Sequence, residues 1–268
     1  MKKKIILTGG HSGIGLELTK KLLAEEHQIG LILRNEKRKN DLSKIIEIKD
    51  IDFFYGDLSK QSEVINIANQ IAGKWSAVDI LYNNAGVLLD EIYLSEQGNE
   101  MHFEVNTIAP LLLAKTLWKN IGHNSELKII NTVTDFLYKQ KKLVSKTLLQ
   151  PTKNQKLFGA YLQSKLALAL LMNDWAKNDH KLKVLNVTPG PNKTKMTSGS
   201  GMPMWLLPFR NLFFSKPTKG ASFLYDAAFN EKFVNQTGVF IQKNKIYNFP
   251  FQLDYNTKSE LLDRIKGL

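Results

Sequence analysis

The sequence predicts one α/β domain, with helices on both faces of a doubly wound and mainly parallel sheet of about seven strands. Three observations lead to this prediction. Short β-branched segments alternate with longer segments whose apolar residues recur at helical spacing. Glycines directly follow the first strand segment. No repeat, low-complexity tract or linker divides the chain, so residues 1–268 are expected to form a single domain.

The expected elements follow one another as strand–helix pairs. The expected strands are residues 3–8, 29–33, 51–55, 78–82, 127–133, 183–187 and 238–242. The expected helices are residues 14–26, 37–48, 60–73, 97–120 and 160–176. Because helices connect successive strands, the strands should run parallel, and ligands of such a sheet bind beyond the carboxyl ends of its strands.

Two segments interrupt this alternation. Residues 135–159 form an insertion after the fifth strand, and the lysines of residues 136–156 have no acidic residue among them. Residues 191–217 are rich in proline, glycine, methionine and aromatic side chains. Long loops inside a compact domain are usually functional or disordered. We expect residues 191–217 to form a lid over an apolar substrate, with packing against the body or contact with a membrane surface or partner as the alternatives.

The composition excludes several classes of protein. The chain has no cysteine, which excludes disulfides, thiolate metal sites and a cysteine nucleophile, and fits a reducing compartment. Its five histidines show no ligand spacing, so no catalytic metal is expected. Its apolar runs fall well short of the roughly 20 residues of a membrane-spanning helix. We therefore expect a cytoplasmic protein.

The net charge is +12, from 37 basic and 25 acidic residues. The lysines are scattered over most of the chain, and no nucleic-acid-binding motif accompanies them. We expect a solvated basic surface and no nucleic-acid partner. The alternative is docking of an acidic partner or a weak contact with an anionic membrane surface.

A glycine-rich loop, TGGHSGIG at residues 8–15, lies between the first strand and the first helix. Gly9 allows a sharp turn, Gly13 lets the backbone approach a pyrophosphate, and Gly15 lets the helix pack closely on the strand. The start of the helix then offers free N–H groups to phosphate. A tight turn without a ligand is the simpler alternative. The residues expected to hold a dinucleotide here are Gly9, Ser12, Gly13, Ile14 and Gly15.

The end of the second strand decides which dinucleotide binds. Sites for NAD usually place a carboxylate there, about 20 residues after the glycines, to bind the ribose hydroxyls. This chain has Arg34 at that place, with Lys37 and Arg38 close by. A guanidinium can pair with the 2′-phosphate of NADP, which favours NADP(H) over NAD(H). Alternatively, Arg34 is a solvated charge beside a helix. His11, within the glycine loop, is expected to face solvent rather than to bind that phosphate.

A tyrosine and a lysine stand four residues apart in YLQSK, within the expected helix 160–176. Tyr161 and Lys165 therefore share one face of the helix. The ammonium of Lys165 should lower the pKa of Tyr161 from about 10 towards neutrality, so that the phenol acts as an acid in one direction and a base in the other. Such pairs are common on helices, so this one needs support from the rest of the chain.

Five motifs in a fixed order provide that support. They are TGGHSGIG at 8–15, NNAG at 83–86, EVN with Asn106, YLQSK at 161–165 and PG at 189–190. In this order, over almost the whole chain, the sequence resembles the short-chain dehydrogenase/reductase family. The segments YLQSKLALALL and EQGNEMHFEVN resemble its retinol-dehydrogenase-like branch most. The resemblance implies a Rossmann fold and a bound nicotinamide cofactor.

The resemblance also implies roles for the matching residues. Those that would line the adenosine side are Asp57, Leu58, Asn84, Ala85 and Gly86. Those that would hold the nicotinamide and pyrophosphate side are Pro189, Gly190 and Thr194. Lys165 would bind the nicotinamide ribose while it tunes Tyr161. Asn106 would support a water that relays protons from Lys165 to solvent.

The chain departs from the family at the serine that orients the substrate. The segment KIINTVTD at 128–135 places Thr134 there, with Thr132 as the reserve candidate. A threonine hydroxyl can make the same hydrogen bonds to a carbonyl oxygen, although its methyl group narrows the pocket. Asp135 follows directly. Facing the pocket, it would disfavour acidic substrates, but strand alternation predicts that it points away.

Together these residues predict an NADP(H)-dependent oxidoreductase that transfers a hydride between the nicotinamide and the carbonyl or alcohol of a fairly apolar small molecule. The residues expected to carry the reaction are Asn106, Thr134, Tyr161 and Lys165. The alternative is a regulator or scaffold that binds NADP(H) but has lost its chemistry. Residues 107–118 and 166–176 are apolar on more than one face, which predicts a homodimer unless the residues after 250 cover them.

Overall fold

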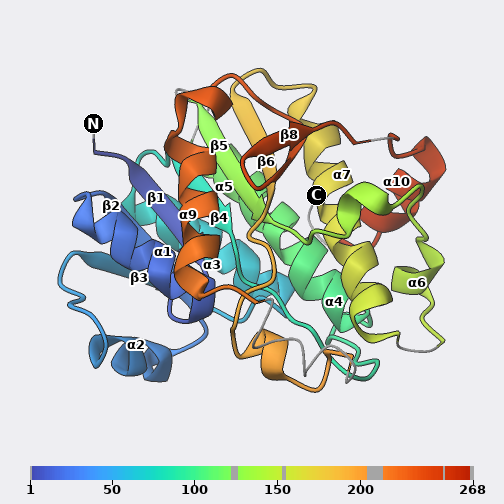
Figure 1. Ribbon diagram of the computed structural model, residues 1–268, viewed down its shortest axis with the longest axis horizontal. Helices are drawn as coiled ribbons and strands as arrows, with labels where there is room; N and C mark the ends of the chain where they lie inside the picture. The colour runs from blue at the N-terminus through green and yellow to red at the C-terminus, as the bar shows by residue number, and fades with distance from the viewer. Residues whose placement is uncertain (1, 122–125, 153–154, 204–213, 250, 266–268) are drawn as a thin grey trace.

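Among the residues that the structure describes, eight strands form one sheet in the middle of the molecule (Figure 1). The computed structural model describes residues 2–121, 126–152, 155–203, 214–249 and 251–265. The strands are β1 (Lys4–Thr8), β2 (Gln28–Leu33), β3 (Ile51–Tyr55), β4 (Ile80–Asn83), β5 (Leu127–Thr132), β6 (Leu182–Thr188), β7 (Val239–Gln242) and β8 (Lys245–Tyr247). The sequence predicts the first seven, whereas β8 is an addition.

The strand order creates a crevice for a ligand. Along the sheet the order is β3-β2-β1-β4-β5-β6-β7-β8, and every neighbouring pair is parallel except β7 and β8. The chain therefore winds outwards from β1 to β3 on one side and from β4 to β7 on the other. The direction reverses between β1 and β4, so the loops that leave these strands diverge beyond their carboxyl ends.

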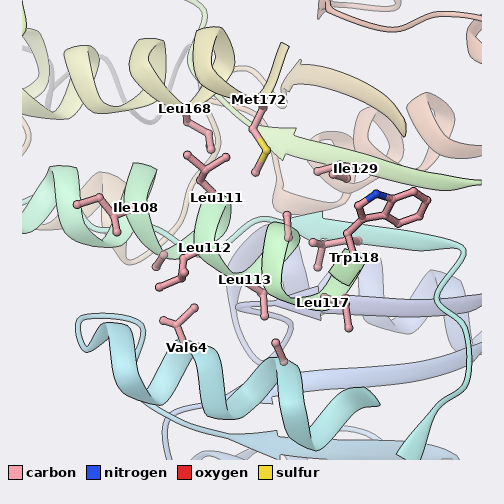
Figure 2. Close-up of a cluster of buried hydrophobic side chains, with 14 of the residues drawn as sticks. Val64, Ile108, Leu111, Leu112, Leu113, Leu117, Trp118, Ile129, Leu168 and Met172 are labelled. Atoms are coloured by element: carbon pink, nitrogen blue, oxygen red, sulfur yellow. The ribbon is translucent and has the colours of Figure 1, made fainter. Parts of the chain in front are cut away.

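Helices cover both faces of the sheet, as the sequence predicts. The helices are α1 (Gly13–Ala24), α2 (Glu36–Ser43), α3 (Gln61–Lys74), α4 (Met101–Phe103), α5 (Ala109–Ile121), α6 (Lys146–Leu149), α7 (Ala160–Ala176), α9 (Pro217–Phe229) and α10 (Tyr255–Leu262). On one face, α1 and α9 pack through residues such as Leu18 and Leu224. On the other face, α3, α5 and α7 contribute Val64, Leu112 and Leu168 to one core (Figure 2). Burial of these side chains supplies the main driving force for folding.

Some elements differ from the sequence prediction. The expected helix 97–120 consists of α4, a π-helical turn at Glu104–Ile108, and α5. Such turns often occur at functional sites. The insertion 135–159 contains short helical segments such as α6. Of the predicted lid 191–217, residues 204–213 lie outside the described residues.

Besides α6, two further helices were not predicted. α9 begins with Pro217 at its first position, which is a start signal that the sequence offers, because proline lacks the N–H that a helix start leaves free. α10 begins after Asp254, whose carboxylate accepts a hydrogen bond from the backbone N–H of Thr257 at 2.9 Å. None of the described helices has the length and apolar character needed to span a membrane.

The C-terminal segment lies against α7. Almost every side chain of α7 is buried, and the core on that side includes Leu261 and Ile265. Lys258 Nζ lies 2.6 Å from Asp174 Oδ2 of α7. Residues after 250 therefore cover part of the apolar surface of α7 that was expected to face a second copy of the chain. The homodimer stays a prediction.

The same segment reaches a buried carboxylate. Glu104 is fully buried, and its Oε1 accepts a hydrogen bond from Gln61 Nε2 at 3.0 Å. Its Oε2 accepts from Ser95 Oγ and Asn99 Nδ2, each at 2.8 Å. The amides of Gln61 and Asn99 also donate to the backbone oxygen of Arg264, at 3.0 and 3.4 Å. A buried charge needs such partners, so this network ties the π-helical turn to the C-terminal segment.

Candidate active site

The glycine loop has the geometry of a phosphate cradle. Gly9 and Gly13 have positive φ angles of 69° and 55°. A Cβ on Gly15 would lie 2.2 Å from the backbone oxygen of Gly9, and one on Gly13 would lie 3.2 Å from Thr194 Cγ2. Ser12 makes no side-chain cap to α1, so the first N–H groups of the helix are available to a ligand. This loop fits a dinucleotide pyrophosphate, and Thr194 lies directly against it.

Hydrogen bonds join the glycine loop to the segment after β4. Thr8 Oγ1 accepts from the backbone N–H groups of Asn84 and Ala85 at 3.0 and 2.9 Å. Asn84 Nδ2 donates to the backbone oxygen of Thr8 at 3.1 Å. The carboxyl ends of β1 and β4 are therefore held together where the sheet changes direction.

Cations gather at the end of β2. Arg34 Nε lies 3.2 Å from Asp57 Oδ2, although the Arg34 side chain is 62% exposed. Burial would raise the pKa of Asp57, but hydrogen bonds from Ser59 and the charge of Arg34 outweigh it and lower that pKa. His11 lines the same cavity as Arg34 and Arg38, and its Nδ1 is buried without a partner among the described residues. The expectation that His11 faces solvent is wrong.

The charges around His11 indicate an anion site. Burial lowers the pKa of the imidazole, and the charges of Arg38, Arg34 and Lys195 lower it further. Four basic side chains, His11, Arg34, Arg38 and Lys195, therefore converge here, with Asp41 and Asp57 as acidic neighbours. From the sequence, solvent exposure was favoured over phosphate binding for His11, because its closeness to Arg34 and Arg38 arises only on folding.

Tyr161 and Lys165 lie together in a cavity of about 650 Å³. Both side chains come from α7 and are almost completely buried. A Cβ on Gly86 would lie 3.2 Å from Lys165 Nζ and 2.8 Å from Asn106 Oδ1, so the ammonium lies directly beside the loop after β4. Within the described residues, the ammonium has no hydrogen-bond or ion-pair partner. It is therefore available to ribose hydroxyls.

Burial controls the protonation of this pair. It raises the pKa of Tyr161 to about 12 and lowers the pKa of Lys165 to about 8. The expectation that Lys165 brings the pKa of Tyr161 towards neutrality is thus wrong for this structure. Removal from water disfavours both charged forms, and this effect dominates at a site so deeply buried. The phenol is accordingly in its protonated, proton-donating form at neutral pH.

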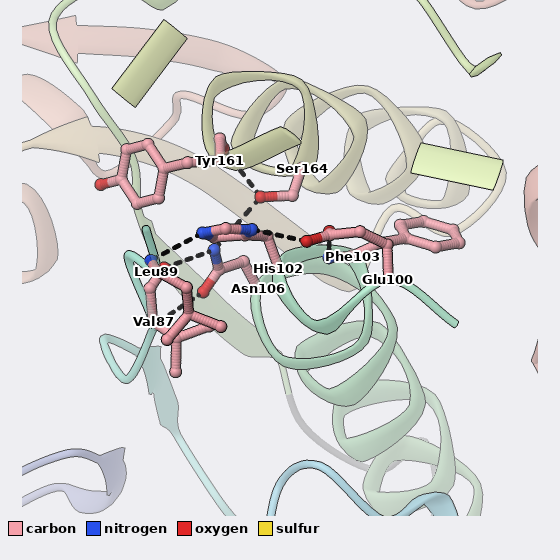
Figure 3. A network of polar contacts seen from close by, with 8 residues as sticks. All are labelled: Val87, Leu89, Glu100, His102, Phe103, Asn106, Tyr161 and Ser164. Carbon is pink, nitrogen blue, oxygen red and sulfur yellow. Dashed lines mark hydrogen bonds and ion pairs between the residues drawn. The ribbon is translucent and has the colours of Figure 1, made fainter. Parts of the chain in front are cut away.

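Asn106 holds the loop that follows Gly86 (Figure 3). Its Oδ1 accepts from the backbone N–H of Val87 at 2.8 Å, and its Nδ2 donates to the backbone oxygen of Val87 at 3.0 Å and to Ser164 Oγ at 3.2 Å. Ser164 Oγ donates to the backbone oxygen of Tyr161 at 2.7 Å. The Asn106 side chain lies behind the cavity wall, and its role in a proton relay stays a prediction.

A buried histidine holds the same loop one residue further on. The backbone N–H of Leu89 donates to His102 Nε2 at 2.9 Å, so Nδ1 carries the proton and donates to Glu100 Oε1 at 2.6 Å. The His102 ring packs edge-on against the Tyr161 ring, with 6.2 Å between centroids (Figure 3). The pairing of Glu100 with His102 was not predicted, although both residues lie in the motif EQGNEMHFEVN.

The two candidate threonines lie at the end of β5 and just after it. Thr134 and Thr132 both line the cavity, and Thr132 Oγ1 lies 3.5 Å from Asn84 Oδ1. Asp135 also lines it, contrary to the expectation that it points away. The physical reason is that β5 ends at Thr132. A turn follows, closed by a hydrogen bond from the Leu137 N–H to the Thr134 oxygen at 3.1 Å, so strand alternation no longer applies.

The segment after β6 completes the cavity. Gly190 has a φ angle of 72°, and its N–H donates to Thr188 Oγ1 at 3.2 Å. Asn192 Nδ2 donates to the backbone oxygens of Pro189 and Gly190 at 2.7 and 2.9 Å. Asn192 was not singled out from the sequence, although it follows the PG motif closely.

One cavity contains nearly all the site residues expected from the sequence. The expected residues that line it are Gly9, Ser12, Gly13, Ile14, Gly15, Arg34, Asp57, Leu58, Asn84, Ala85, Gly86, Thr134, Tyr161, Lys165, Pro189, Gly190 and Thr194. Asn106 is adjacent to it. Among the described residues, no group of three or more His, Asp or Glu side chains is arranged to hold a metal ion.

Comparison with known proteins identifies the family. A family model described as short chain dehydrogenase matches residues 3–202. The chain belongs to the short-chain dehydrogenase/reductase family. It is an NAD(P)-dependent oxidoreductase that acts on an alcohol–carbonyl pair.

Curated relatives indicate the branch of the family. The chain is 27% identical to polyprenol dehydrogenase of Danio rerio over 248 residues, which cover 85% of this chain and 75% of that protein. It is 27% identical to human retinol dehydrogenase 13, over 75% of this chain and 62% of that protein. It is 25% identical to human retinol dehydrogenase 11, over 85% of this chain and 73% of that protein. These relatives confirm the retinol-dehydrogenase-like branch.

Solved structures share the fold. Salutaridine reductase from Papaver somniferum has a TM-score of 0.67 at 17% identity, over 90% of this chain and 100% of that one. A short-chain dehydrogenase from Shigella flexneri, complexed with NADP, has a TM-score of 0.66 at 20% identity, over 90% of this chain and 96% of that one. The Rossmann fold predicted from the sequence is confirmed.

Proposed function

We propose that this dehydrogenase uses NADP(H) in preference to NAD(H) and acts on the carbonyl or alcohol group of a fairly apolar small molecule. The observation that carries the proposal is the shared cavity. It joins the glycine loop, the cations after β2, and the buried pair Tyr161 and Lys165. One elongated ligand could therefore contact all three.

The chemistry follows from the protonation states. NADPH, when bound, supplies the hydride. Tyr161, with a pKa raised to about 12, is protonated at neutral pH and donates its proton to the oxygen of the reduced carbonyl. The Thr134 hydroxyl donates a hydrogen bond to the same oxygen and orients it. Lys165 holds ribose hydroxyls and stabilises the phenolate that remains.

Charge at the adenosine end supports the cofactor preference. A 2′-phosphate is doubly charged near neutral pH, and a guanidinium pairs with it through charge-assisted hydrogen bonds. Arg34, Arg38 and His11 line the cavity at this end. Arg34 pairs with Asp57 in the present structure, so we infer that the phosphate competes with this carboxylate for the guanidinium.

The other end of the cavity supports an apolar substrate. The apolar side chains that line it are Val87, Leu88, Val133, Phe136, Leu157 and Met202. They line the same cavity as Tyr161, with surface that favours hydrocarbon over water. The named relatives are dehydrogenases of a polyprenol and of retinol, which are apolar alcohols. No observation on the described residues favours a chain that binds NADP(H) without turnover.

Thermal unfolding tests the cofactor preference. A ligand at 100 times its dissociation constant adds about 2.7 kcal/mol, or about 5 °C in Tm for a chain of this size. We expect NADPH to raise Tm more than NADH does at the same concentration. Arg34→Ala should reduce the preference about tenfold, since a charge-assisted hydrogen bond is lost. The exposed Lys44 provides the control, Lys44→Ala. Equal shifts with both cofactors in the wild type would contradict the proposal.

Quaternary structure and location belong to the same proposal. We infer a cytoplasmic homodimer, with at most weak contact to an anionic membrane surface. Light scattering at micromolar concentration tests the dimer, and a monomeric mass would remove it. Sedimentation with acidic vesicles at low and high salt tests the membrane contact, because screening by salt weakens electrostatic binding.

A further inference from the structure

Asp135 brings an acidic side chain to the substrate end of the cavity. Among the described residues that line the cavity, the acidic ones are Asp57 and Asp135. Asp57 follows β3 and Asp135 follows β5, so four strand spacings separate them, about 19 Å along the sheet. Asp57 already pairs with Arg34 at the adenosine end. Asp135 is thus the acidic group nearest to Thr134, its neighbour in the chain.

Hydrogen bonds from two other strands fix this carboxylate. Asp135 Oδ1 accepts from Thr188 Oγ1 at 2.7 Å and from Gln242 Nε2 at 2.8 Å. Thr188 is the last residue of β6, and Gln242 is the last residue of β7. Both donors are neutral, and within the described residues Asp135 has no ion-pair partner. The side chain is held in one position without neutralisation of its charge.

Apolar side chains are among the sequence neighbours of Asp135. Val133 and Leu137 are buried, and Phe136 packs edge-on against Phe158 at 5.3 Å between centroids. A charge beside apolar side chains acts over a longer distance than a charge in water. The arginines of the cavity are at its opposite end, after β2. Lys165 shares the cavity and, with a pKa lowered to about 8, still carries its charge at neutral pH, but within the described residues no ion pair joins it to Asp135.

We propose that Asp135 determines which substrates this enzyme accepts by their charge. It excludes compounds that carry a carboxylate next to the reacting carbonyl, and it admits neutral ones. The inference rests on the proposed function, because Thr134 places the carbonyl oxygen beside Asp135. Repulsion between two carboxylates in this cavity weakens binding of the acid relative to its ester.

The test uses one pair of substrates and two variants. The pair is 2-oxo-4-phenylbutanoate and its ethyl ester, which differ in the charge next to the carbonyl. Asp135→Asn removes the charge but keeps an oxygen that accepts from Thr188 and Gln242. Asp135→Ala removes both the charge and the acceptor oxygen. Glu47→Gln, at an exposed position, is the control for removal of a negative charge.

We expect the wild-type enzyme to favour the ester strongly in kcat/KM with NADPH. Asp135→Asn should reduce that preference about tenfold or more, mainly by improving KM for the acid. Asp135→Ala should also lower kcat for the ester, because Thr188 and Gly190 lose their anchor. Glu47→Gln should keep the wild-type preference.

Binding separates this inference from the proposed function. Calorimetry with 2-hydroxy-4-phenylbutanoate and its ethyl ester, in the presence of NADPH, measures the same preference without turnover. If Asp135→Asn changes the preference in binding while no variant turns over, the inference stands and the proposed function fails. An unchanged preference in both measurements overturns the inference. If neither ligand binds the wild-type protein, the inference and the proposed function are both overturned, because the substrate would then not bind at the end of the cavity that holds Thr134 and Asp135.

Discussion

The two ends of the cavity are built by different means. At the cofactor end, backbone geometry makes the site: positive φ angles, close approaches that only glycine allows, and a helix start with available N–H groups. At the substrate end, side chains from three strand ends and an insertion make it, among them Thr134, Asp135 and Phe136. A site built from backbone geometry therefore leaves a strict sequence signature, whereas a site built from side chains does not.

The largest expected effect is a fall in kcat in Tyr161→Phe, without a change in cofactor binding. Tyr161→Phe removes the proton donor but keeps the ring that packs against His102. We expect kcat to fall at least about 100-fold, while the dissociation constant for NADPH stays nearly unchanged. Steady-state kinetics and a fluorescence titration measure the two quantities. Tyr138→Phe, at an exposed tyrosine, is the matched control. More than about a tenth of wild-type kcat in Tyr161→Phe would contradict the assigned role.

The second prediction concerns the free energy of unfolding, which burial of the Lys165 ammonium lowers. The pKa of Lys165 is lowered to about 8 in the folded protein, from 10.5 in the unfolded chain, so the unfolded chain binds more protons between these values. Stability should therefore rise from pH 8 to about 10.5. Below pH 8, Lys165→Met should be more stable than the wild type by about 3 kcal/mol, with the difference vanishing towards pH 10.5.

Urea unfolding of the cofactor-free protein at several pH values measures this difference. The matched control is Lys177→Met, at an exposed lysine, which should show no such pH-dependent gain. If the free energies of unfolding of Lys165→Met and the wild type differ by a constant amount from pH 7 to 10.5, burial of the ammonium does not cause the difference.

The third effect tests the backbone-built end. Gly15→Ala would bring a Cβ within 2.2 Å of the Gly9 oxygen, and the backbone must shift to relieve the contact. We expect a loss of about 1–3 kcal/mol in stability and a weaker affinity for NADPH. In Gly73→Ala the new Cβ meets nothing within 4 Å, so that helix should gain slightly. Chemical denaturation and cofactor titration compare the variants, and equal behaviour would refute the steric argument.

The same contrast explains how much the sequence could predict. Strand segments and the glycine loop were predictable because burial on both sheet faces demands apolar runs, and close approach demands glycine. The direction of the Asp135 side chain could not be predicted, because it depends on where β5 ends. The position of His11 in the cavity and the hydrogen bond from the Leu89 N–H to His102 could not be predicted either. Each arises from neighbours that the chain brings together only on folding.

The pKa of Tyr161 was also beyond reach of the sequence. Spacing alone gives the distance between Tyr161 and Lys165 along the helix, but not the depth at which they are buried. The depth of burial determines both pKa values, because removal from water disfavours the charged form of each group. β8 and α10 likewise have short or weakly patterned sequences, and their places follow from the apolar surface that they cover.

The contact between Arg264 and the amides of Gln61 and Asn99 has a consequence for biosynthesis. Arg264 follows every described helix and strand in the chain, yet it completes the shell around Glu104 in the π-helical turn that carries Asn106. A ribosome releases the sheet and the glycine loop well before this residue emerges. The shell around Glu104 is therefore completed only when Arg264 has left the ribosome, after every described strand has been synthesised.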